Sequence, residues 1–255
     1  MEVRQMLETK GVTIKFGGLT AVNHVDMKVR ANKITGLIGP NGAGKTTFFN
    51  CISGVYTPNE GQVLFNGKNI EGMKPYQICN AGISRTYQVI NLFWKMSAIE
   101  NVMVGMHPRL KSGFLTDLIK TPAVRAEEKM VREKAYEWLK FVGLEKYADD
   151  PSGSLSYGGQ RLLEIVRGLA SDSKILLLDE PAAGMNTKEK AEFDELLQKI
   201  LEKGVTILMI EHDMKLVMNI CDYLYVLEYG KLLAHGTPEE IQNHPEVIRA
   251  YLGGE

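Results

Sequence analysis

The sequence predicts an α/β protein with a parallel sheet at its core, an antiparallel β segment ahead of it and a helical segment within it. Apolar runs of strand length at residues 175–178 and 205–210 flank a helical pattern that ends near Lys203. This alternation is typical of a βαβ unit with parallel strands. A third apolar run, residues 34–38, leads directly into a glycine-rich turn and a helix. From about Ser97 to Leu144 the apolar spacing is helical instead.

The first segment is rich in strand patterns. Residues 6–16 read as a strand, and apolar residues then alternate with polar ones up to Val29. Residues 45–53 form a helical pattern that Gly54 ends. Asn66-Gly67 separates two short strand patterns, residues 62–65 and 68–70, and this dipeptide predicts a two-residue hairpin.

Local helix signals mark the later segments. Ser97 and Glu100 match a capping box, and residues 124–142 carry apolar side chains at helical spacing. Thr237 followed by Pro238 predicts the start of a tail helix, with threonine as N-cap. No internal repeat or low-complexity linker divides the 255 residues. We therefore expect one compact unit with subdomains.

Composition narrows the class of protein. The apolar share is 44% and the charged share 24%, which is ordinary for a soluble globular protein. The formal net charge of −1 gives no general attraction to nucleic acid or anionic lipid. The three cysteines lie far apart without metal-ligand spacing, which fits a reducing compartment. Neither a signal peptide nor a stretch of about 20 apolar residues is visible, so we expect a cytosolic chain.

Residues 39–46 fit the pattern GxxxxGK[ST] and are called the phosphate loop below. Small residues are required because backbone N–H groups must wrap the phosphates. Lys45 would reach the β- and γ-phosphates, and Thr46 would give a hydroxyl to Mg²⁺. The helix that follows adds its positive end. The expected nucleotide contacts here are Gly39, Pro40, Asn41, Gly42, Ala43, Gly44, Lys45, Thr46 and Thr47.

Two acids, Asp179 and Glu180, follow the apolar run at residues 175–178. Ligands of α/β sheets bind at the carboxyl ends of the strands. Asp179 suits an acid that holds Mg²⁺ through its water shell. Glu180 is then placed to orient and deprotonate the attacking water.

Residues 155–160 read LSYGGQ and precede a helical pattern; they are called the signature segment below. A serine and two glycines that open a helix make a second anion site. A single γ-phosphate does not need contacts from both the phosphate loop and the signature segment of the same subunit. The economical arrangement places each nucleotide between the phosphate loop of one subunit and the signature segment of another.

The phosphate loop, LSYGGQ, ILLLDE and His212, in this order, resemble the nucleotide-binding subunit of an ATP-binding cassette (ABC) transporter. The resemblance covers essentially the whole chain. It implies a P-loop NTPase fold with a RecA-like parallel sheet core, an antiparallel β subdomain and an α-helical signature subdomain. It also implies one nucleotide-binding domain over residues 1–255, with core and β subdomains at about 1–88 and 160–255 and a helical subdomain at 89–159.

The resemblance assigns roles to further residues. Phe16 matches the aromatic residue that stacks on adenine, although a strand aromatic in the core is the alternative. Gln88 matches the glutamine that links Mg²⁺ and the attacking water to the transporter contact surface. His212 matches the histidine that contacts the γ-phosphate. The nucleotide contacts of the signature segment would be Ser156, Gly158, Gly159 and Gln160. The expected catalytic residues are Glu180, His212, Gln88 and Lys45.

Two positions depart from the family pattern. Tyr157 stands where the commonest signature has glycine, so the loop conformation there is open to question. Asn186 stands where the family has aspartate, which puts an inter-subunit charge contact in doubt. Neither change removes a catalytic group. Several of the apolar residues that follow Gln88 are expected to line a groove for a short permease helix, with burial in the helical subdomain as the alternative for any one of them. These residues are Val89, Ile90, Leu92, Phe93 and Trp94.

Residues 15–22, 41–48, 211–217 and 236–253 resemble the LivG-type subunit of branched-chain amino acid importers, as does segment 107–122. The resemblance implies ATP and Mg²⁺ as cofactors and a head-to-tail dimer with a second ABC ATPase subunit. It implies two membrane permeases, an extracytoplasmic substrate-binding protein reached indirectly, and a peripheral position on the cytoplasmic face of the membrane. The alternatives are the ATPase of another importer, of a lipopolysaccharide-type exporter, or a soluble ABC ATPase acting on nucleic acid. A small-molecule P-loop kinase would leave LSYGGQ unexplained, and the lack of basic extensions disfavours nucleic acid.

Overall fold

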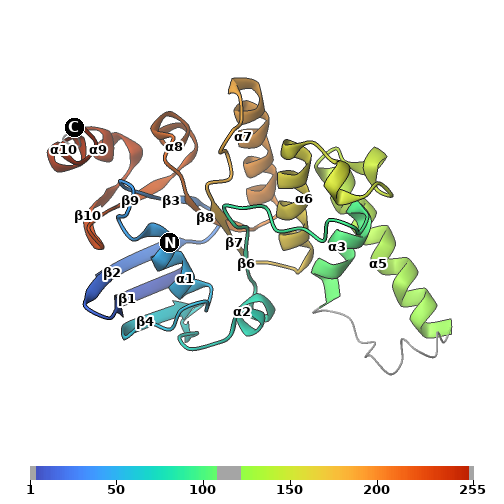
Figure 1. Ribbon diagram of the computed structural model, residues 1–255, viewed down its shortest axis with the longest axis horizontal. Coiled ribbons are helices and arrows are strands. Elements are labelled where there is room, and N and C mark those ends of the chain that lie inside the picture. The colour runs from blue at the N-terminus through green and yellow to red at the C-terminus, as the bar shows by residue number, and fades with distance from the viewer. Residues whose placement is uncertain (1–3, 108–121, 253–255) are drawn as a thin grey trace. The chain divides into compact units, whose positions relative to one another are not determined.

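The computed structural model describes residues 4–107 and 122–252, with side chains at 4–107 and 125–251. The chain forms two compact units, shown in Figure 1. Unit 1 comprises Met1–Arg85 and Lys174–Glu255, and unit 2 comprises Thr86–Ser173. Segment 107–122, which the sequence singled out, falls outside the described residues except at its two ends.

Unit 1 contains an antiparallel sheet in which the strand order is β2-β1-β4-β5. Its strands are β1 (Gln5–Phe16), β2 (Leu19–Arg30), β4 (Glu60–Phe65) and β5 (Lys68–Asn69). Between β4 and β5, Asn66 and Gly67 have φ values of 48° and 76°. Positive φ at both central residues is the geometry of a type I′ turn, so the predicted hairpin is confirmed.

The second sheet of unit 1 has the strand order β10-β9-β3-β8-β7-β6. These strands are β3 (Ile34–Ile38), β6 (Ile83–Arg85), β7 (Ile175–Asp179), β8 (Thr206–Ile210), β9 (Tyr223–Glu228) and β10 (Lys231–Gly236). All of these pairs are parallel except β9 with β10. Every residue of β3, β7 and β8 is buried, as expected of a parallel sheet covered on both faces. The predicted parallel core is confirmed.

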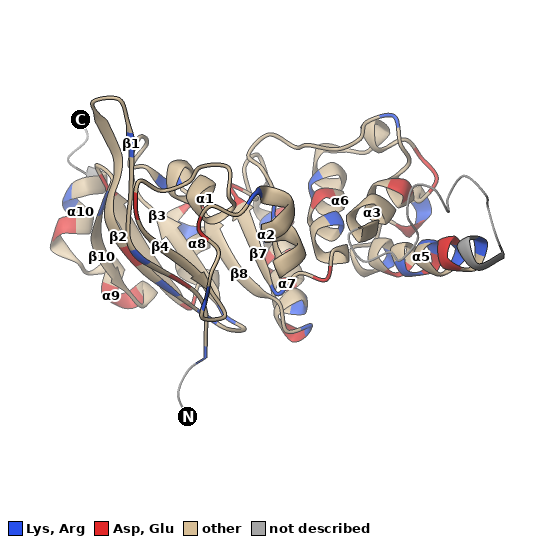
Figure 2. Ribbon diagram, turned by 90° about the horizontal axis from the view of Figure 1, so that it is seen from below, with Lys and Arg blue, Asp and Glu red and all other residues tan. Residues whose placement is uncertain are grey.

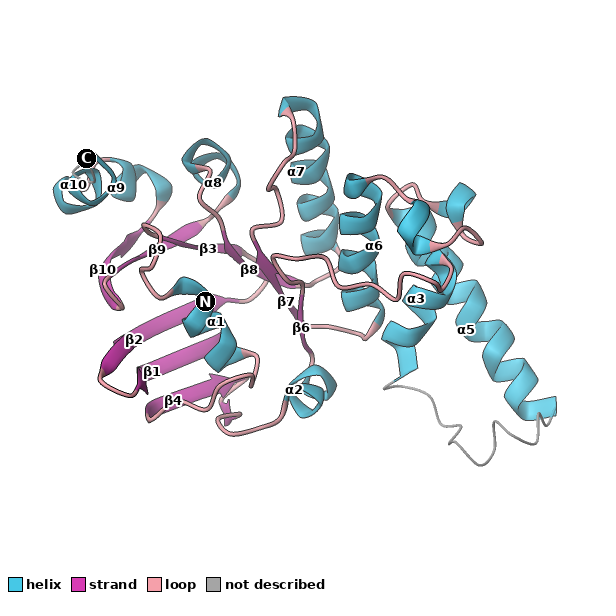
Figure 3. Cartoon of the chain, viewed as in Figure 1, coloured by secondary structure: helices cyan, strands magenta, loops and turns pink. Residues whose placement is uncertain are grey.

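One helix of unit 1 joins its two sheets. Phe48, Phe49 and Ile52 of α1 (Lys45–Ile52) share an apolar core with strand residues of both sheets. The Thr237 side chain caps the tail helix as predicted, because its oxygen accepts from the Glu240 amide. Figure 3 shows the helices and strands in separate colours. The other helices of unit 1 in the described residues are α2 (Pro75–Ala81), α7 (Thr187–Glu202), α8 (Met214–Ile220), α9 (Pro238–Gln242) and α10 (Pro245–Leu252).

Unit 2 is helical, with α3 (Ala98–Met106), α5 (Pro122–Phe141) and α6 (Tyr157–Ala170). Short 3₁₀ turns lie at Glu145–Tyr147 and Ser152–Ser154. Ser97 and Glu100 form the predicted capping box at the start of α3. Val102, Leu139 and Leu163, one from each helix, are fully buried in a common core. Helix α6 thus packs with unit 2, and the second boundary lies after Ser173 instead of near residue 159.

Charges of both signs alternate along α5, as Figure 2 shows. Lys129 lies 3.9 Å from Glu133 on the next turn, and Arg132 pairs at 2.6 Å with Asp149. Such exposed pairs contribute little to stability, so this helix is held by its buried face. No helix within residues 4–107 and 122–252 has both the length and the apolar character needed to cross a membrane.

Candidate functional site

The phosphate loop connects the buried strand β3 to α1 in unit 1. Gly39, Gly42 and Gly44 have φ values of 148°, 78° and 95°, which side-chain-bearing residues rarely adopt. A Cβ placed on Gly44 would lie 2.5 Å from the Ala21 carbonyl oxygen. Gly44 is the N-cap of α1, and no side chain caps this helix. Its first N–H groups therefore remain available to an anion.

Lys45 is held inside this loop. Its Nζ donates to the carbonyl oxygens of Gly39 at 2.7 Å and Pro40 at 2.9 Å. Burial lowers the pKa of Lys45, while the carboxylates of Glu180 and Asp179 act in the opposite direction. A phosphate that replaced these two carbonyl contacts would give the ammonium a full counter-charge.

A cleft of about 490 Å³ opens beside the loop within unit 1. Phe16 lines it with 44% of its surface exposed and packs edge-on against Tyr56, the ring centroids 5.2 Å apart. The alternative of a core aromatic is therefore wrong. Predicted residues in the lining are Phe16, Asn41, Gly42, Ala43, Gly44, Lys45, Thr46, Thr47 and Glu180, whereas Gly39, Pro40, Asp179 and His212 are not part of it.

The residue after β7, Glu180, takes a constrained backbone geometry. Its φ is 48°, which is unusual for a residue with a side chain and typical of functional sites. Its N–H donates to the Ile210 carbonyl at 2.9 Å, so the ends of β7 and β8 hold it. The carboxylate lines the cleft, and its Oε2 lies 3.8 Å from Nδ1 of His212. The structure thus brings the predicted base and sensor together.

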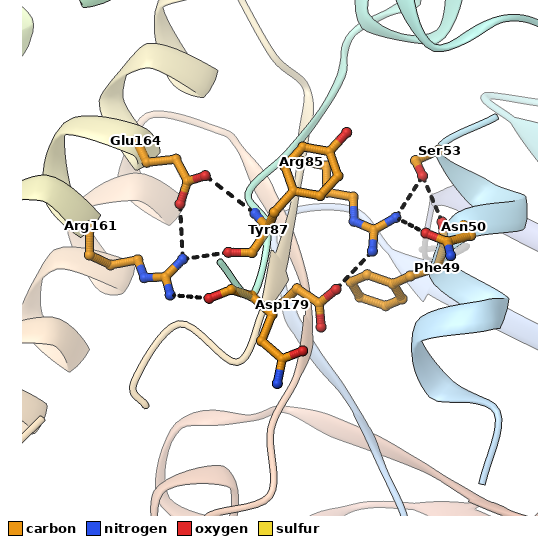
Figure 4. A network of polar contacts seen from close by, with 9 residues as sticks. Phe49, Asn50, Ser53, Arg85, Tyr87, Arg161, Glu164 and Asp179 are labelled. Carbon is orange, nitrogen blue, oxygen red and sulfur yellow. Dashed lines mark hydrogen bonds and ion pairs between the residues drawn. The ribbon is translucent and has the colours of Figure 1, made fainter. Parts of the chain in front are cut away.

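Asp179 is buried and paired with Arg85. The Arg85 Nη2 atom lies 2.7 Å from Asp179 Oδ2, and its Nη1 donates to Asn50 and Ser53 on and after α1 (Figure 4). The guanidinium also lies over the Phe49 ring, 5.6 Å from its centroid. Arg85 therefore connects the expected Mg²⁺ acid to the helix that follows the phosphate loop.

Glu211, the residue after β8, is a second buried acid near this edge. Its carboxylate accepts from the amides of Ala182 at 2.8 Å and His212 at 3.2 Å. Burial raises the pKa of Glu211, and these hydrogen bonds counteract the increase. Glu211 thus ties the loop after Glu180 to the backbone of His212.

The remaining predicted residues belong to unit 2. Ser156 is the N-cap of α6, and its hydroxyl accepts from the Gly159 amide at 3.2 Å. The Gln160 side chain donates to the Leu155 carbonyl at 2.9 Å, and Gly158 is half-buried. Gln88 is exposed, and its own carbonyl accepts from Arg161 at 3.0 Å.

The Asn186 position has a local structural role. Its side-chain oxygen accepts from the amides of Lys188 at 2.9 Å and Glu189 at 3.1 Å, so Asn186 is the N-cap of α7. Asparagine and aspartate cap helices about equally well. Helix α7 therefore begins normally in spite of the departure from the family pattern.

Several residues around these sites were missed in the sequence. Tyr229 and Gly230, in the turn between β9 and β10, line the cleft. The Gly230 amide donates to Ala43 at 3.1 Å, and its carbonyl accepts from Asn23 at 2.8 Å, which docks this turn on the phosphate loop. Tyr229 has a φ of 46° and is 85% exposed. The only feature of the sequence that indicates this turn is the dipeptide Tyr229-Gly230 after an apolar run. Arg85, Arg161 and Glu164 lay in no motif, and Glu211 lay within the segment 211–217 without a role assigned to it.

Comparison with known proteins identifies the family. Residues 22–183 match the model of the ABC transporter family, and residues 231–255 match that of the branched-chain amino acid ATP-binding cassette transporter. The chain is 48% identical to the high-affinity branched-chain amino acid transport ATP-binding protein LivG of Salmonella typhimurium, over 97% of this chain and 98% of that protein.

The corresponding protein BraF of Pseudomonas aeruginosa is also 48% identical, over 98% of both chains. A crystal structure of a nucleotide-free ATP-binding cassette from an ABC transporter is 34% identical with a TM-score of 0.85, over 98% of this chain and 100% of the other. The chain therefore belongs to the ABC transporter family and is an ATP-binding, ATP-hydrolysing cassette subunit of the LivG and BraF group.

Proposed function

We propose that this subunit hydrolyses ATP with Mg²⁺ to power the import of leucine, isoleucine, valine or similar amino acids. Its main support is near-full-length similarity to two proteins named for that transport. The match over residues 231–255 points the same way, because it lies outside the ATP-binding motifs. ATP chemistry is the same in importers and exporters, so the site itself does not select the cargo.

The residues present fit an ATP–Mg²⁺ complex. A Cβ on Gly39 or Gly44 would lie 2.1 or 2.5 Å from a backbone carbonyl oxygen, and the buried ammonium of Lys45 lies against two carbonyls that phosphate oxygens would replace. No group of three or more His, Cys, Asp or Glu able to hold a metal occurs in the described part of the chain. Magnesium usually keeps several waters and binds through one or two carboxylates and substrate phosphates. The protein groups assigned to the ion are then those expected from the sequence, Thr46, Asp179 and Gln88.

Each residue of the site has a separate task in the proposed reaction. Lys45 and the loop amides hold the β- and γ-phosphates, and Phe16 supports the base. Mg²⁺, when bound, neutralises charge on the phosphates. Glu180 accepts the proton of the attacking water, and its backbone is fixed by the hydrogen bond from its N–H to the Ile210 carbonyl. His212, whose ring lies 3.8 Å from that carboxylate, contacts the γ-phosphate and completes the arrangement.

A second cassette subunit completes each nucleotide site in this proposal. Ser156 caps its own helix, but the side chain is exposed and can also meet a phosphate. Two permeases would dock on unit 2, with a substrate-binding protein beyond them. Val89, Phe93 and Trp94 are 81%, 50% and 47% exposed and suit an apolar contact. Ile90 and Leu92 are buried in the core of unit 2 and do not contribute. The chain would then lie on the cytoplasmic face of the membrane.

Uptake of radiolabelled amino acids tests the transport assignment. A strain that lacks this gene and any second such system should lose low-micromolar uptake of leucine, isoleucine and valine. The wild-type gene should restore uptake, whereas Glu180→Gln should not. Unchanged uptake of all three in the deletion strain, with normal uptake of an unrelated amino acid, would contradict the assignment. In that case the ATPase chemistry would stand and the cargo would be another substrate of the family.

A further inference from the structure

A buried ion pair lies on α6, just beyond the signature segment. Arg161 and Glu164 are one turn apart, with Arg161 Nη1 at 2.9 Å from Glu164 Oε2. Their side chains are 0% and 1% exposed. Taking two charges out of water is costly, and an apolar pair of similar size often serves packing as well or better. This pair therefore needs a reason beyond packing.

The pair binds the backbone of residues 87–91, and Figure 4 shows its contacts with Tyr87. Arg161 Nη1 donates to the Tyr87 carbonyl at 2.6 Å, and Nη2 donates to the Gln88 carbonyl at 3.0 Å. Glu164 Oε1 accepts from the Tyr87 amide at 3.4 Å and the Asn91 amide at 3.2 Å. Two carbonyls and two amides of residues 87–91 are thus fixed to α6.

The signature segment is connected to the same guanidinium. Nη2 of Arg161, which bonds the Gln88 carbonyl, also lies 3.4 Å from the Tyr157 hydroxyl. The guanidinium carbon is 5.9 Å from the centre of the Tyr157 ring, within the range of a cation–π contact. Tyr157 is the residue that replaces the common glycine of the signature. A glycine could make neither contact.

We propose that Arg161 and Glu164 are positioning residues that fasten residues 87–91 to the signature helix, so that Gln88 and Ser156 are displaced together. The inference rests on the proposed function, in which permeases act near Gln88 and ATP meets Ser156. Residues 87–91 expose Val89 and bury Ile90, so a partner pressing on Val89 acts on a strip whose backbone is bonded to α6. Rigid coupling of this kind needs hydrogen bonds of fixed direction, which the planar guanidinium supplies.

The test replaces both charges at once, because a single loss would leave one buried charge unpaired and strongly destabilise the fold. Arg161→Met/Glu164→Leu is made in the full-length chain and compared with Arg132→Met/Asp149→Leu, which removes an exposed pair of the same unit. Arg161→Lys is a second variant that keeps the charge but cannot reproduce the four directed bonds of the planar guanidinium. Circular dichroism sets a temperature at which every variant is folded.

Two measurements separate positioning from packing. The amides of Tyr87 and Asn91 should exchange hydrogen at least about tenfold faster in the double variant. ATP hydrolysis should lose about 10- to 100-fold in kcat, the scale of a misplaced catalytic group, with an ATP dissociation constant within about twofold of wild type because the phosphate loop is untouched. The Arg132→Met/Asp149→Leu control should match wild type in both.

A third variant asks whether the effect passes through Gln88. Adding Gln88→Ala to the double variant should lower kcat no further than Gln88→Ala alone, because both remove one function. If the kcat losses of Gln88→Ala and of the double variant multiplied, the positioning role would be overturned. Faster hydrogen exchange with an unchanged kcat would overturn it too, and in both cases the ion pair would have a structural role only. Unchanged exchange would refute the fastening itself. If the wild-type chain showed no ATP hydrolysis, or hydrolysis that Glu180→Gln left unchanged, the proposed function itself would be contradicted.

Discussion

Replacing Arg85 with methionine removes the cation that balances Asp179 at the end of β7. The Arg85 and Asp179 side chains are 5% and 3% exposed, so neither charge is shielded by water. Removing one partner of such a buried pair typically costs about 3–5 kcal/mol. That is a large part of the about 5–15 kcal/mol that holds a domain folded. At about 2–4 °C per kcal/mol for a chain of this size, the melting temperature should fall by about 6–20 °C.

The double variant Arg85→Met/Asp179→Leu should recover most of this loss, because no uncompensated charge then remains. Lys188→Met removes an exposed pair with Glu192 in the same unit and should change stability by less than about 1 kcal/mol. Urea unfolding followed by far-ultraviolet circular dichroism is the appropriate assay. Both tryptophans, Trp94 and Trp138, lie in unit 2, so their fluorescence would not report on the unit that loses the pair.

The outcomes distinguish charge from shape. A double variant as unstable as Arg85→Met would show that the loss comes from the packing of Arg85 on Phe49 and its bonds to α1. Wild-type stability in Arg85→Met would refute the view that Asp179 needs this cation. The double variant should have lost Mg²⁺-dependent ATP hydrolysis even where its stability is restored, because Asp179 is the acid assigned to the ion.

Three further predictions concern separate parts of the chain. Phe16→Ala should weaken ATP binding by about 1–3 kcal/mol, measured by calorimetry, whereas Tyr76→Ala, an exposed tyrosine of the same unit, should not. Val89→Asp should abolish transport in cells while the purified chain keeps its ATPase activity; loss of both would indicate a packing defect. Glu211→Gln should become more stable relative to wild type as the pH rises from about 4 to about 8. The native pKa of Glu211 is raised above the about 4.3 of an exposed glutamate, so wild type loses stability through this carboxyl as it ionises. A pH-independent difference between the two proteins would contradict the assignment of that titration to Glu211.

The sequence was most informative where the physics is local. The phosphate loop, the Asn66-Gly67 hairpin, the capping box at Ser97 and the N-cap at Thr237 depend on neighbouring residues alone, and the structure has each of these elements. The parallel strands were recognisable because burial on both faces demands short continuous apolar runs.

The rest depended on partners far apart in the chain. Arg85 meets Asp179 across 94 positions, and Arg161 meets the Gln88 carbonyl across 73. No spacing rule reveals such pairs. The apolar face of α6 would read the same against either unit, so the boundary after Ser173 could not be placed. The apolar residues after Gln88 divide into buried Ile90 and Leu92 and exposed Val89 and Phe93, which only the packing of unit 2 decides.

The claim that Glu180 is the base of an ATPase is tested most directly by Glu180→Gln in the purified chain. The substitution preserves the size of the side chain and one acceptor oxygen, but the amide cannot take up the proton of water. ATP binding should stay within about twofold of wild type while kcat falls by about 10²–10⁴, the range typical of a lost general base. Glu195→Gln, the same change at an exposed residue outside the cleft lining, serves as the matched control and should keep its turnover. Wild-type kcat in Glu180→Gln would contradict the account.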